Sequence, residues 1–187
     1  MRVIFANYWS RMKINDIDFR ILLSEEQLQG RVKQLAKALD KDYKRKTPLF
    51  LPVLNGSFIF AADLLRELNG PSRVSFVKHA SYSGTSSSGQ LKSLIGLQES
   101  VFKQDVVIVE DIIDTGLTIQ RVVEELTSLG TSSVEVVALL RKERSKTNAL
   151  QPKYIGFDIA DEFVVGYGLD HDGLGRNLKD LWQQGKA

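Results

Sequence analysis

The feature that most constrains this fold is an unbroken apolar run in the middle of the chain. Residues 106–110 read VVIVE, so β-branched residues stand side by side instead of alternating with polar ones. A strand of this composition has to be buried on both faces. A second such run, VEVVALL, follows at 134–140, and a helical pattern over 116–129 lies between the two and ends before Gly130. This order predicts an α/β fold with a central parallel sheet and helices on both faces.

Elements before this region extend the same pattern. Ser24 precedes two acidic residues and a helical repeat of leucine and valine, which is typical of the start of an amphipathic helix. The elements expected are a helix over 24–42, a strand over 48–54, a helix over 58–68 that follows an Asn–Gly turn, and a strand over 74–77. The chain therefore reads strand–helix–strand repeatedly, as a parallel sheet requires.

The two ends of the chain differ from this middle part. Residues 13–23 alternate loosely, and residues 153–169 are β-rich and punctuated by glycine. We expect these ends to pair as a small β-rich hood made of about 13–23 and 151–187, beside a core of about 24–150. A length of 187 residues fits one compact domain, so a single domain over 1–187 is expected.

Composition excludes several classes of function. The chain has no cysteine, so thiol catalysis, thiolate metal sites and disulfides are absent, and cytoplasmic residence is expected. The net charge is +2, from 25 basic and 23 acidic residues, which does not favour nucleic acid as a partner. No run of about 18 apolar residues occurs, so no membrane partner is expected either.

The segment 106–118, VVIVEDIIDTGLT, combines the features of an anion site. The buried strand is expected to end at Glu110 and Asp111, and a short turn then opens a helix. Ligands of parallel sheets bind beyond the carboxyl ends of the strands, and the free N–H groups of a helix N-terminus suit a phosphate. Two acids beside a phosphate are suited to polyol hydroxyls or to a magnesium-bound ligand. The structural alternative is that the acids end the strand and Asp114 caps the helix.

This string resembles the signature with which type I phosphoribosyltransferases bind 5-phosphoribosyl 1-pyrophosphate (PRPP). The signature is a buried strand, an acidic pair and then D-T-G-x-T, and neither GxxxxGK[ST] nor GxGxxG occurs in the chain. The resemblance implies that Glu110 and Asp111 grip the ribose hydroxyls and that Asp114 accepts the purine N7 proton. It further implies that PRPP binds to a loop formed by Asp114, Thr115, Gly116, Leu117 and Thr118.

Two further segments resemble the 6-oxopurine (hypoxanthine–guanine) branch of this family. Residues 51–65, LPVLNGSFIFAADLL, are similar to the loop that contacts pyrophosphate through backbone amides. The resemblance implies pyrophosphate contacts at Leu54, Asn55 and Gly56 and a non-proline cis peptide between the first two. The family often has lysine at the position of Asn55, and an ordinary Asn–Gly turn is the alternative.

The Ser81-Tyr82 pair is similar to the start of the family's mobile lid, here residues 81–93. The resemblance implies that this pair closes over the pyrophosphate and excludes water from a cation-like sugar. The alternative is a serine-rich connector without a role in binding.

Residues 154–178 resemble the family's purine-binding segment. By position, Phe163 would stack on the purine, Val164 would contact its edge through backbone groups, Asp170 would hold magnesium, and Arg176 would contact pyrophosphate. The alternative is that the apolar members of this set are core residues.

Members of the family usually have a lysine that donates to the 6-oxo group of the purine. Counting back from Gly156 places a different residue at that position in this chain. That count gives Gln151, whose amide still donates a hydrogen bond but without charge. Lys153 would share a strand face with Gln151 and could substitute. The resemblance therefore leaves the ranking of hypoxanthine, guanine and xanthine open and disfavours adenine.

The reaction implied is transfer of the phosphoribosyl group of PRPP to a purine base, with release of pyrophosphate. Mg²⁺ is the implied cofactor, held at Glu110, Asp111 and Asp170. PRPP and a purine base are the expected small-molecule partners, and the family implies a homodimer or homotetramer. Two alternatives stay open: a xanthine, uracil or other base phosphoribosyltransferase, and a non-catalytic regulator of the same fold that senses PRPP or nucleotides.

Overall fold

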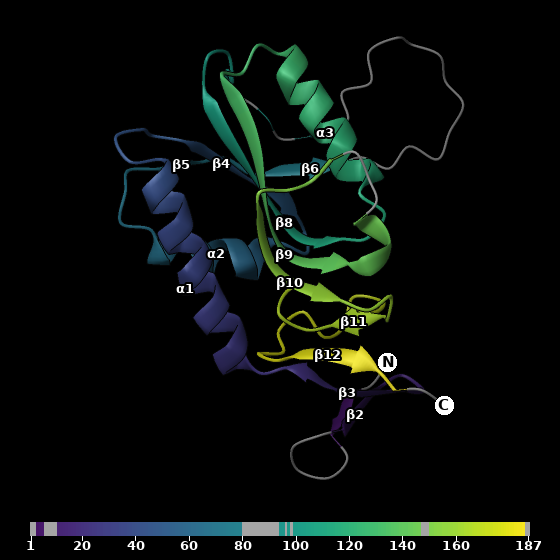
Figure 1. Cartoon of the computed structure of the whole chain (residues 1–187). Coiled ribbons are helices and arrows are strands. Elements are labelled where there is room, and N and C mark those ends of the chain that lie inside the picture. The colour runs from purple at the N-terminus through teal and green to yellow at the C-terminus, as the bar shows by residue number, and fades with distance from the viewer. Residues whose placement is uncertain are drawn as a thin grey trace, which may run out of the picture.

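The computed structural model describes residues 3–5, 11–79, 94–95, 97, 99–146 and 150–185. A seven-stranded sheet forms the body of the protein in the order β10-β9-β8-β4-β6-β7, with β5 paired to β4 (Figure 1). All of its pairs are parallel except β6–β7 at one edge. The strands are β4 (Leu49–Leu54), β5 (Arg73–Val74), β6 (Val77–His79), β7 (Leu94–Ile95), β8 (Asp105–Ile113), β9 (Ser133–Lys142) and β10 (Tyr154–Ile159).

Helices cover both faces of this sheet, as the sequence predicts. Helices α1 (Glu25–Asp42) and α2 (Phe58–Glu67) lie together on one face, and α3 (Leu117–Ser128) lies on the other (Figure 1). Successive residues of a strand point to opposite faces. Val107 therefore packs with α1 and α2, whereas its neighbour Ile108 packs with α3. Burial of each such side chain stabilises the fold by about 1.5–3 kcal/mol.

Local sequence sets the helix ends. The Ser24 Oγ accepts the N–H of Gln27 at 3.3 Å, and the Gln27 side chain accepts the N–H of Ser24 at 2.9 Å, so α1 begins in a capping box. Helix α3 begins after Gly116, whose φ is 75°, and is followed by Gly130 at φ 78°. Both glycines adopt a left-handed conformation that side chains disfavour. The predicted bounds of both helices are thus confirmed to within a residue or two.

A second, antiparallel sheet forms the hood, in the order β1-β2-β3-β12-β11. It packs a small core of its own that contains Met12, Phe19 and Trp182. The first and last described strands both belong to this sheet, which lies beyond the carboxyl edge of the central one (Figure 1). Its strands are β1 (Val3–Phe5), β2 (Arg11–Ile14), β3 (Ile17–Leu23), β11 (Val164–Val165) and β12 (Leu181–Gln184).

The bounds of several predicted elements need correction. The loosely alternating segment 13–23 is not one strand: β2 and β3 form a hairpin that turns at Asn15, with φ 54°. The predicted strand 74–77 is divided between β5 and β6. Strand β10, which the sequence assigns to the hood, instead pairs with β9 in the central sheet, with Tyr154 opposite Val137. In the described part of the chain, no helix is long and apolar enough to span a membrane.

Candidate functional site

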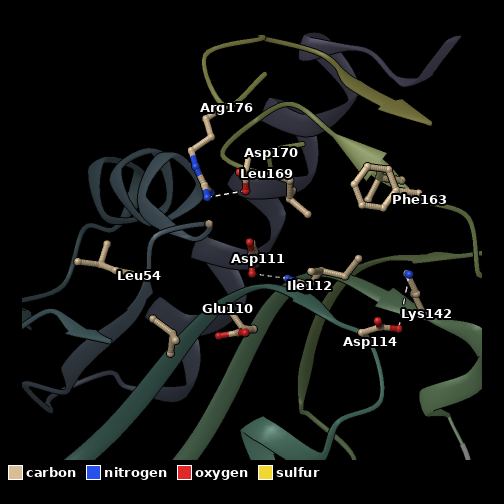
Figure 2. A pocket seen from close by; sticks show the side chains of 13 residues that line it. Leu54, Glu110, Asp111, Ile112, Asp114, Lys142, Phe163, Leu169, Asp170 and Arg176 are labelled. Atoms are coloured by element: carbon tan, nitrogen blue, oxygen red, sulfur yellow. Dashed lines mark hydrogen bonds and ion pairs between the residues drawn. The ribbon is translucent and has the colours of Figure 1, made fainter. Parts of the chain in front are cut away.

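A cavity of about 380 Å³ opens where the carboxyl edge of the central sheet meets the hood. In Figure 2, Asp170 and Arg176 lie at one end, and Phe163, Lys142 and Asp114 lie at the other. Asp111 lies between these groups, with Glu110 below it. The lining residues are Val53, Leu54, Gly56, Glu110, Asp111, Ile112, Asp114, Lys142, Phe163, Val164, Leu169, Asp170 and Arg176.

The acidic pair belongs to β8 itself. The strand does not end at Glu110 and Asp111, as the sequence analysis expects, but continues to Ile113. Glu110 Oε2 is fully enclosed and has no hydrogen-bond partner in the structure. Burial and the charge of Asp111 raise the pKa of Glu110 well above its usual value.

Asp111 points into the cavity beside Glu110 (Figure 2). Burial raises the pKa of Asp111 to about 6, although the N–H of Ile112, which donates to Asp111 Oδ1 at 2.8 Å, and the charge of Arg176 act in the opposite direction. The two adjacent carboxylates are therefore under-compensated, and each gains from a ligand that brings hydroxyl donors or a cation.

Gly56 explains how the loop after β4 fits against this pair. A β-carbon at Gly56 would overlap the carboxylate of Asp111, so any other residue would require that carboxylate to move. The peptide between Leu54 and Asn55 is cis, as the resemblance implies. Leu54 and Gly56 line the cavity, whereas Asn55 is exposed and is absent from the lining.

Asp114 differs from the acidic pair because two cationic side chains lie beside its carboxylate. Arg144, from the short 3-10 helix η1 (Glu143–Ser145), donates from Nε to Asp114 Oδ1 at 2.6 Å and also from Nη2. Lys142 Nζ lies 3.5 Å from the same oxygen (Figure 2). Burial alone would raise the pKa of Asp114, but the hydrogen bond from Arg144 and the two cationic charges hold it below its usual value.

The turn after Asp114 brings an anion site next to the cavity. Gly116 precedes α3, and its carbonyl accepts the N–H of Gln120 at 3.0 Å, so the earlier N–H groups of the helix stay free of intrahelical bonds. The residues predicted for this loop, Thr115, Gly116, Leu117 and Thr118, adjoin the lining residue Asp114 but are not themselves in the lining.

Phe163 and Lys142 form the opposite end from Arg176. The Phe163 ring is 41% exposed although it packs against Phe19 and His171, with centroids 6.3 and 5.4 Å apart. An open aromatic face beside buried Val164 suits a planar ring. The Lys142 side chain is only 11% exposed and is the lysine that lines this cavity.

The predicted purine readers Gln151 and Lys153 are not brought to the cavity. The Gln151 side chain donates to the carbonyl of Lys146 at 2.9 Å and accepts from Arg141 at 3.3 Å. Lys153 Nζ pairs with Asp42 Oδ2 at 2.9 Å, beside α1. The sequence reasoning missed Lys142, although its position at the carboxyl end of β9, next to β8 in the sheet, was a usable signal.

Asp170 and Arg176 are paired at 2.5 Å on the loop between β11 and β12. Arg176 also donates to the carbonyl of Gly168 at 2.7 Å, and Asp170 accepts the N–H of Gly173 at 2.7 Å. A β-carbon at Gly168 would overlap the carbonyl of Gly56, so this loop lies directly against the one after β4. Ser81 and Tyr82 lie outside the described residues.

The acidic residues of the cavity have the chemistry to hold a divalent cation together with other ligands. Within the described ranges, no cluster of three or more aspartate, glutamate or histidine side chains is positioned to hold a metal alone. The unpartnered Glu110 Oε2 and the under-compensated Asp111 are hard oxygen donors, which Mg²⁺ prefers. These residues fit a magnesium ion whose remaining ligands come from water and a bound substrate.

Comparison with known proteins gives consistent matches. The model of the phosphoribosyl transferase domain matches residues 21–172. A hypoxanthine-guanine phosphoribosyltransferase of Staphylococcus aureus (strain Mu50) is 39% identical over 165 residues, which are 88% of this chain and 92% of that protein. One from Staphylococcus epidermidis (strain RP62A) is 39% identical over 159 residues, which are 84% and 89% of the two chains.

Solved structures agree with these matches. A hypoxanthine-guanine phosphoribosyltransferase of Bacillus anthracis superposes with a TM-score of 0.79 at 34% identity, over 88% of this chain and 97% of the other. A hypoxanthine phosphoribosyl transferase of Trypanosoma cruzi superposes with a TM-score of 0.81 at 34% identity, over 92% and 94%.

Proposed function

Because the chain belongs to the phosphoribosyltransferase domain family, we propose that it transfers the 5-phosphoribosyl group of PRPP to N9 of hypoxanthine or guanine. The products are pyrophosphate and IMP or GMP, so the protein is a purine salvage enzyme. The single observation that carries the proposal is one cavity that contains an under-compensated acidic pair and an exposed aromatic ring beside an enclosed lysine, and that adjoins a helix-opening turn through Asp114.

The ribose of PRPP would fit the middle of the cavity, and its 5′-phosphate would fit the turn that adjoins Asp114. The amides and hydroxyls of Thr115, Gly116, Leu117 and Thr118 would hold the 5′-phosphate at the N-terminus of α3. Glu110 and Asp111 would accept hydrogen bonds from the ribose hydroxyls. Their negative charge would also stabilise the positive charge that develops on the sugar as the bond from C1′ to pyrophosphate breaks.

The purine fits the end that Phe163 and Val164 form. Phe163 would stack on the ring, and Val164 would contact its edge through backbone groups. We assign the donor to the 6-oxo group to Lys142, in place of Gln151 or Lys153, because its enclosed ammonium group faces this cavity. An ammonium group donates only, so it suits a carbonyl oxygen and disfavours the amine of adenine.

Asp114 is the proton acceptor in this proposal. As N9 attacks C1′, the electron pair of the C1′–O bond leaves with pyrophosphate, and the N7 proton passes to the Asp114 carboxylate. Its position between Lys142 and the loop for the 5′-phosphate is suited to this role.

Pyrophosphate would bind at the other end of the cavity. The backbone amides of Leu54, Asn55 and Gly56 and the guanidinium of Arg176 would contact it, and Ser81 and Tyr82 of the 81–93 segment would cover it. Glu110, Asp111 and Asp170 would hold Mg²⁺, partly through water and ligand oxygens. When bound, Mg²⁺ supplies positive charge that stabilises the leaving pyrophosphate.

Three further proposals concern the location of the protein, its oligomeric state and its domain organisation. Cytoplasmic residence is proposed from the absence of cysteine, one functional domain over 1–187 from the chain length, and a homodimer or homotetramer from the family resemblance. Light scattering across a range of protein concentrations would test the oligomeric state.

The test of function is pyrophosphate release from PRPP and magnesium with hypoxanthine, guanine, xanthine, adenine and uracil in separate reactions. Turnover with hypoxanthine or guanine is expected, with little or none for adenine. Turnover with xanthine or uracil alone would keep the reaction class but contradict the proposed base. Absence of turnover with every base, in folded protein that binds PRPP, would favour a regulator.

A further inference from the structure

Arg144 holds the carboxylate that the proposed reaction needs as a proton acceptor. Two of its N–H groups donate to the same Asp114 oxygen, and its next acidic neighbour, Asp161, is 3.9 Å away. The helix η1 that bears Arg144 is fixed to the sheet, because Ser145 Oγ donates to the carbonyl of Lys142 at 2.7 Å and lies 3.5 Å from that of Ile113. The backbone at η1 is therefore tied to the sheet, whereas the Arg144 side chain is 45% exposed.

This contact opposes the role of Asp114. A carboxylate that already accepts from one guanidinium, with an ammonium group 3.5 Å away, is a weak acceptor for a further proton. Lys142 is enclosed and faces the cavity, so it stays beside the base during the reaction. Arg144 is outside the cavity lining and is the more exposed of the two cations, 45% against 11%, so its departure uncovers less buried surface.

The turn before α3, the proposed phosphate site, lies next to the Arg144 guanidinium. Asp114 directly precedes the turn that opens α3, and Arg144 donates to the Asp114 carboxylate, so a phosphate bound at this helix N-terminus would lie near Arg144. A guanidinium forms two parallel hydrogen bonds with phosphate oxygens as readily as with a carboxylate, and a phosphate dianion attracts it more strongly. A ligand phosphate at this turn would therefore compete with Asp114 for Arg144.

We propose that Arg144 is a positioning residue that passes from Asp114 to the 5′-phosphate of the bound phosphoribosyl ligand and so frees Asp114 to accept a proton. The inference rests on the proposed function, because it takes the turn at 115–118 as the phosphate site. In the free protein, Arg144 screens the charge of Asp114 from the incoming phosphate. In the complex, it binds that phosphate and leaves Lys142 as the cation beside Asp114.

The test uses ribose 5-phosphate as the probe, in calorimetric titrations without base, pyrophosphate or magnesium. Arg144→Gln should weaken binding about tenfold, because a charge-assisted pair with the phosphate is lost. Arg144→Lys should recover part of the affinity. Arg141→Gln is the matched control: Arg141 also bonds a carboxylate near the end of β9 at 2.7 Å, but that of Asp158 and not that of Asp114, so the substitution should leave binding unchanged.

A variant of the competing carboxylate separates this exchange from a structural role. Asp114→Asn should tighten ribose 5-phosphate binding, because Arg144 is then released without the ligand. The gain should be clearly smaller in the R144Q background, since the two positions then act as a coupled pair. Merely structural support by Arg144 would make the effect of D114N equal in both backgrounds.

Two outcomes would overturn the proposal: R144Q binding within twofold of the original protein, or an equal effect of D114N in both backgrounds. Thermal unfolding shows whether R144Q is folded, and if it is not, R144K and D114N alone still decide. Because the titration contains no base, failure of purine turnover would refute the proposed function without changing this result.

Discussion

The acidic pair and Asp114 are carboxylates on one short stretch of chain, yet their surroundings are opposite. Glu110 and Asp111 lie in β8, where burial raises their pKa values, that of Asp111 to about 6. Asp114, three residues further on, accepts from Arg144 and lies 3.5 Å from Lys142, and its pKa is held below the usual value. Differences of this kind between neighbouring carboxylates separate their roles in a site.

The contrast shows what each group still needs from a ligand. The acidic pair has surplus negative charge, so it gains from hydroxyl donors, from magnesium and from a sugar that becomes positive. Asp114 is already compensated, so it gains nothing until a cation leaves it. The pair is thus suited to binding, whereas Asp114 is suited to a proton transfer that begins only after the ligand is in place.

The largest effect we expect is from Asp114→Asn. The amide cannot accept the N7 proton, so kcat should fall about 100- to 10,000-fold while PRPP still binds at least as tightly as to the original protein. Steady-state kinetics with hypoxanthine would measure this. Asp161→Asn is the control, because Asp161 is also near Arg144, at 3.9 Å, but does not line the cavity. A kcat for D114N within threefold of the original value would remove Asp114 from the role of base.

Gly56→Ala should perturb the acidic pair next most strongly. The new methyl group would overlap the Asp111 carboxylate and displace it from the ribose hydroxyls. Misplacement by about 1 Å can reduce the rate about 100-fold, so a loss of that order in kcat/KM for PRPP is expected. Gly30→Ala in α1 is the matched control, because a β-carbon there meets nothing within 4 Å. Unchanged kcat/KM for G56A would show that Asp111 is free to move without cost.

The sequence relates site residues to one another most directly where they lie on one stretch of chain. The acidic pair, Asp114 and Gly116 follow one another around the end of a strand and the start of a helix, so spacing alone relates them. The alternation that divides Val107 from Ile108 is equally local. Patterns of this kind are determined by the period of the strand and helix.

The parts that sequence misses depend on pairing between distant segments. A count along the chain led to Gln151, whereas the cavity contains Lys142, which reaches the same edge because β9 runs parallel to β8, with Arg141 opposite Ile113. The assignment of β10 to the hood was wrong for the same reason, because a β-rich sequence does not indicate which sheet the strand joins. The Arg144 contact with Asp114 likewise joins residues 30 positions apart.

Lys142→Met tests the proposed purine-binding end of the cavity, and its effect on the kinetics should be smaller than that of Gly56→Ala. Methionine keeps the apolar stem but loses the donor to the 6-oxo group, so KM for hypoxanthine should rise about tenfold or more. Gln151→Lys is the control, since its side chain faces Lys146 and Arg141 instead of the cavity, and the ranking of bases should not change. A KM that responds to Q151K but not to K142M would reverse the assignment.

The smallest effects should appear in stability, and they should have opposite signs for the two regions. Asp111 has a folded-state pKa of about 6, above its usual 3.8. The folded protein then binds more protons than the unfolded chain between these values, so its stability falls as pH rises from about 4 to about 6. Asp111→Asn removes this penalty and should raise the free energy of unfolding above pH 6 by about 2–3 kcal/mol, with little change at pH 4.

For Asp114 the sign is reversed. Its folded pKa is lowered, so its carboxylate stabilises the protein above the unfolded pKa, and this contribution is lost as pH falls. D114N should therefore be slightly destabilised at pH 7, by less than about 1 kcal/mol because the side chain is half exposed, and the difference should vanish in acid. Urea unfolding of both variants at pH 4 and pH 7 would measure the two signs together. Destabilisation by both substitutions at pH 7 would contradict the difference between Asp111 and Asp114. The negative charge of the acidic pair would then be as well compensated in the free protein as that of Asp114, and a ligand would not be required to stabilise it.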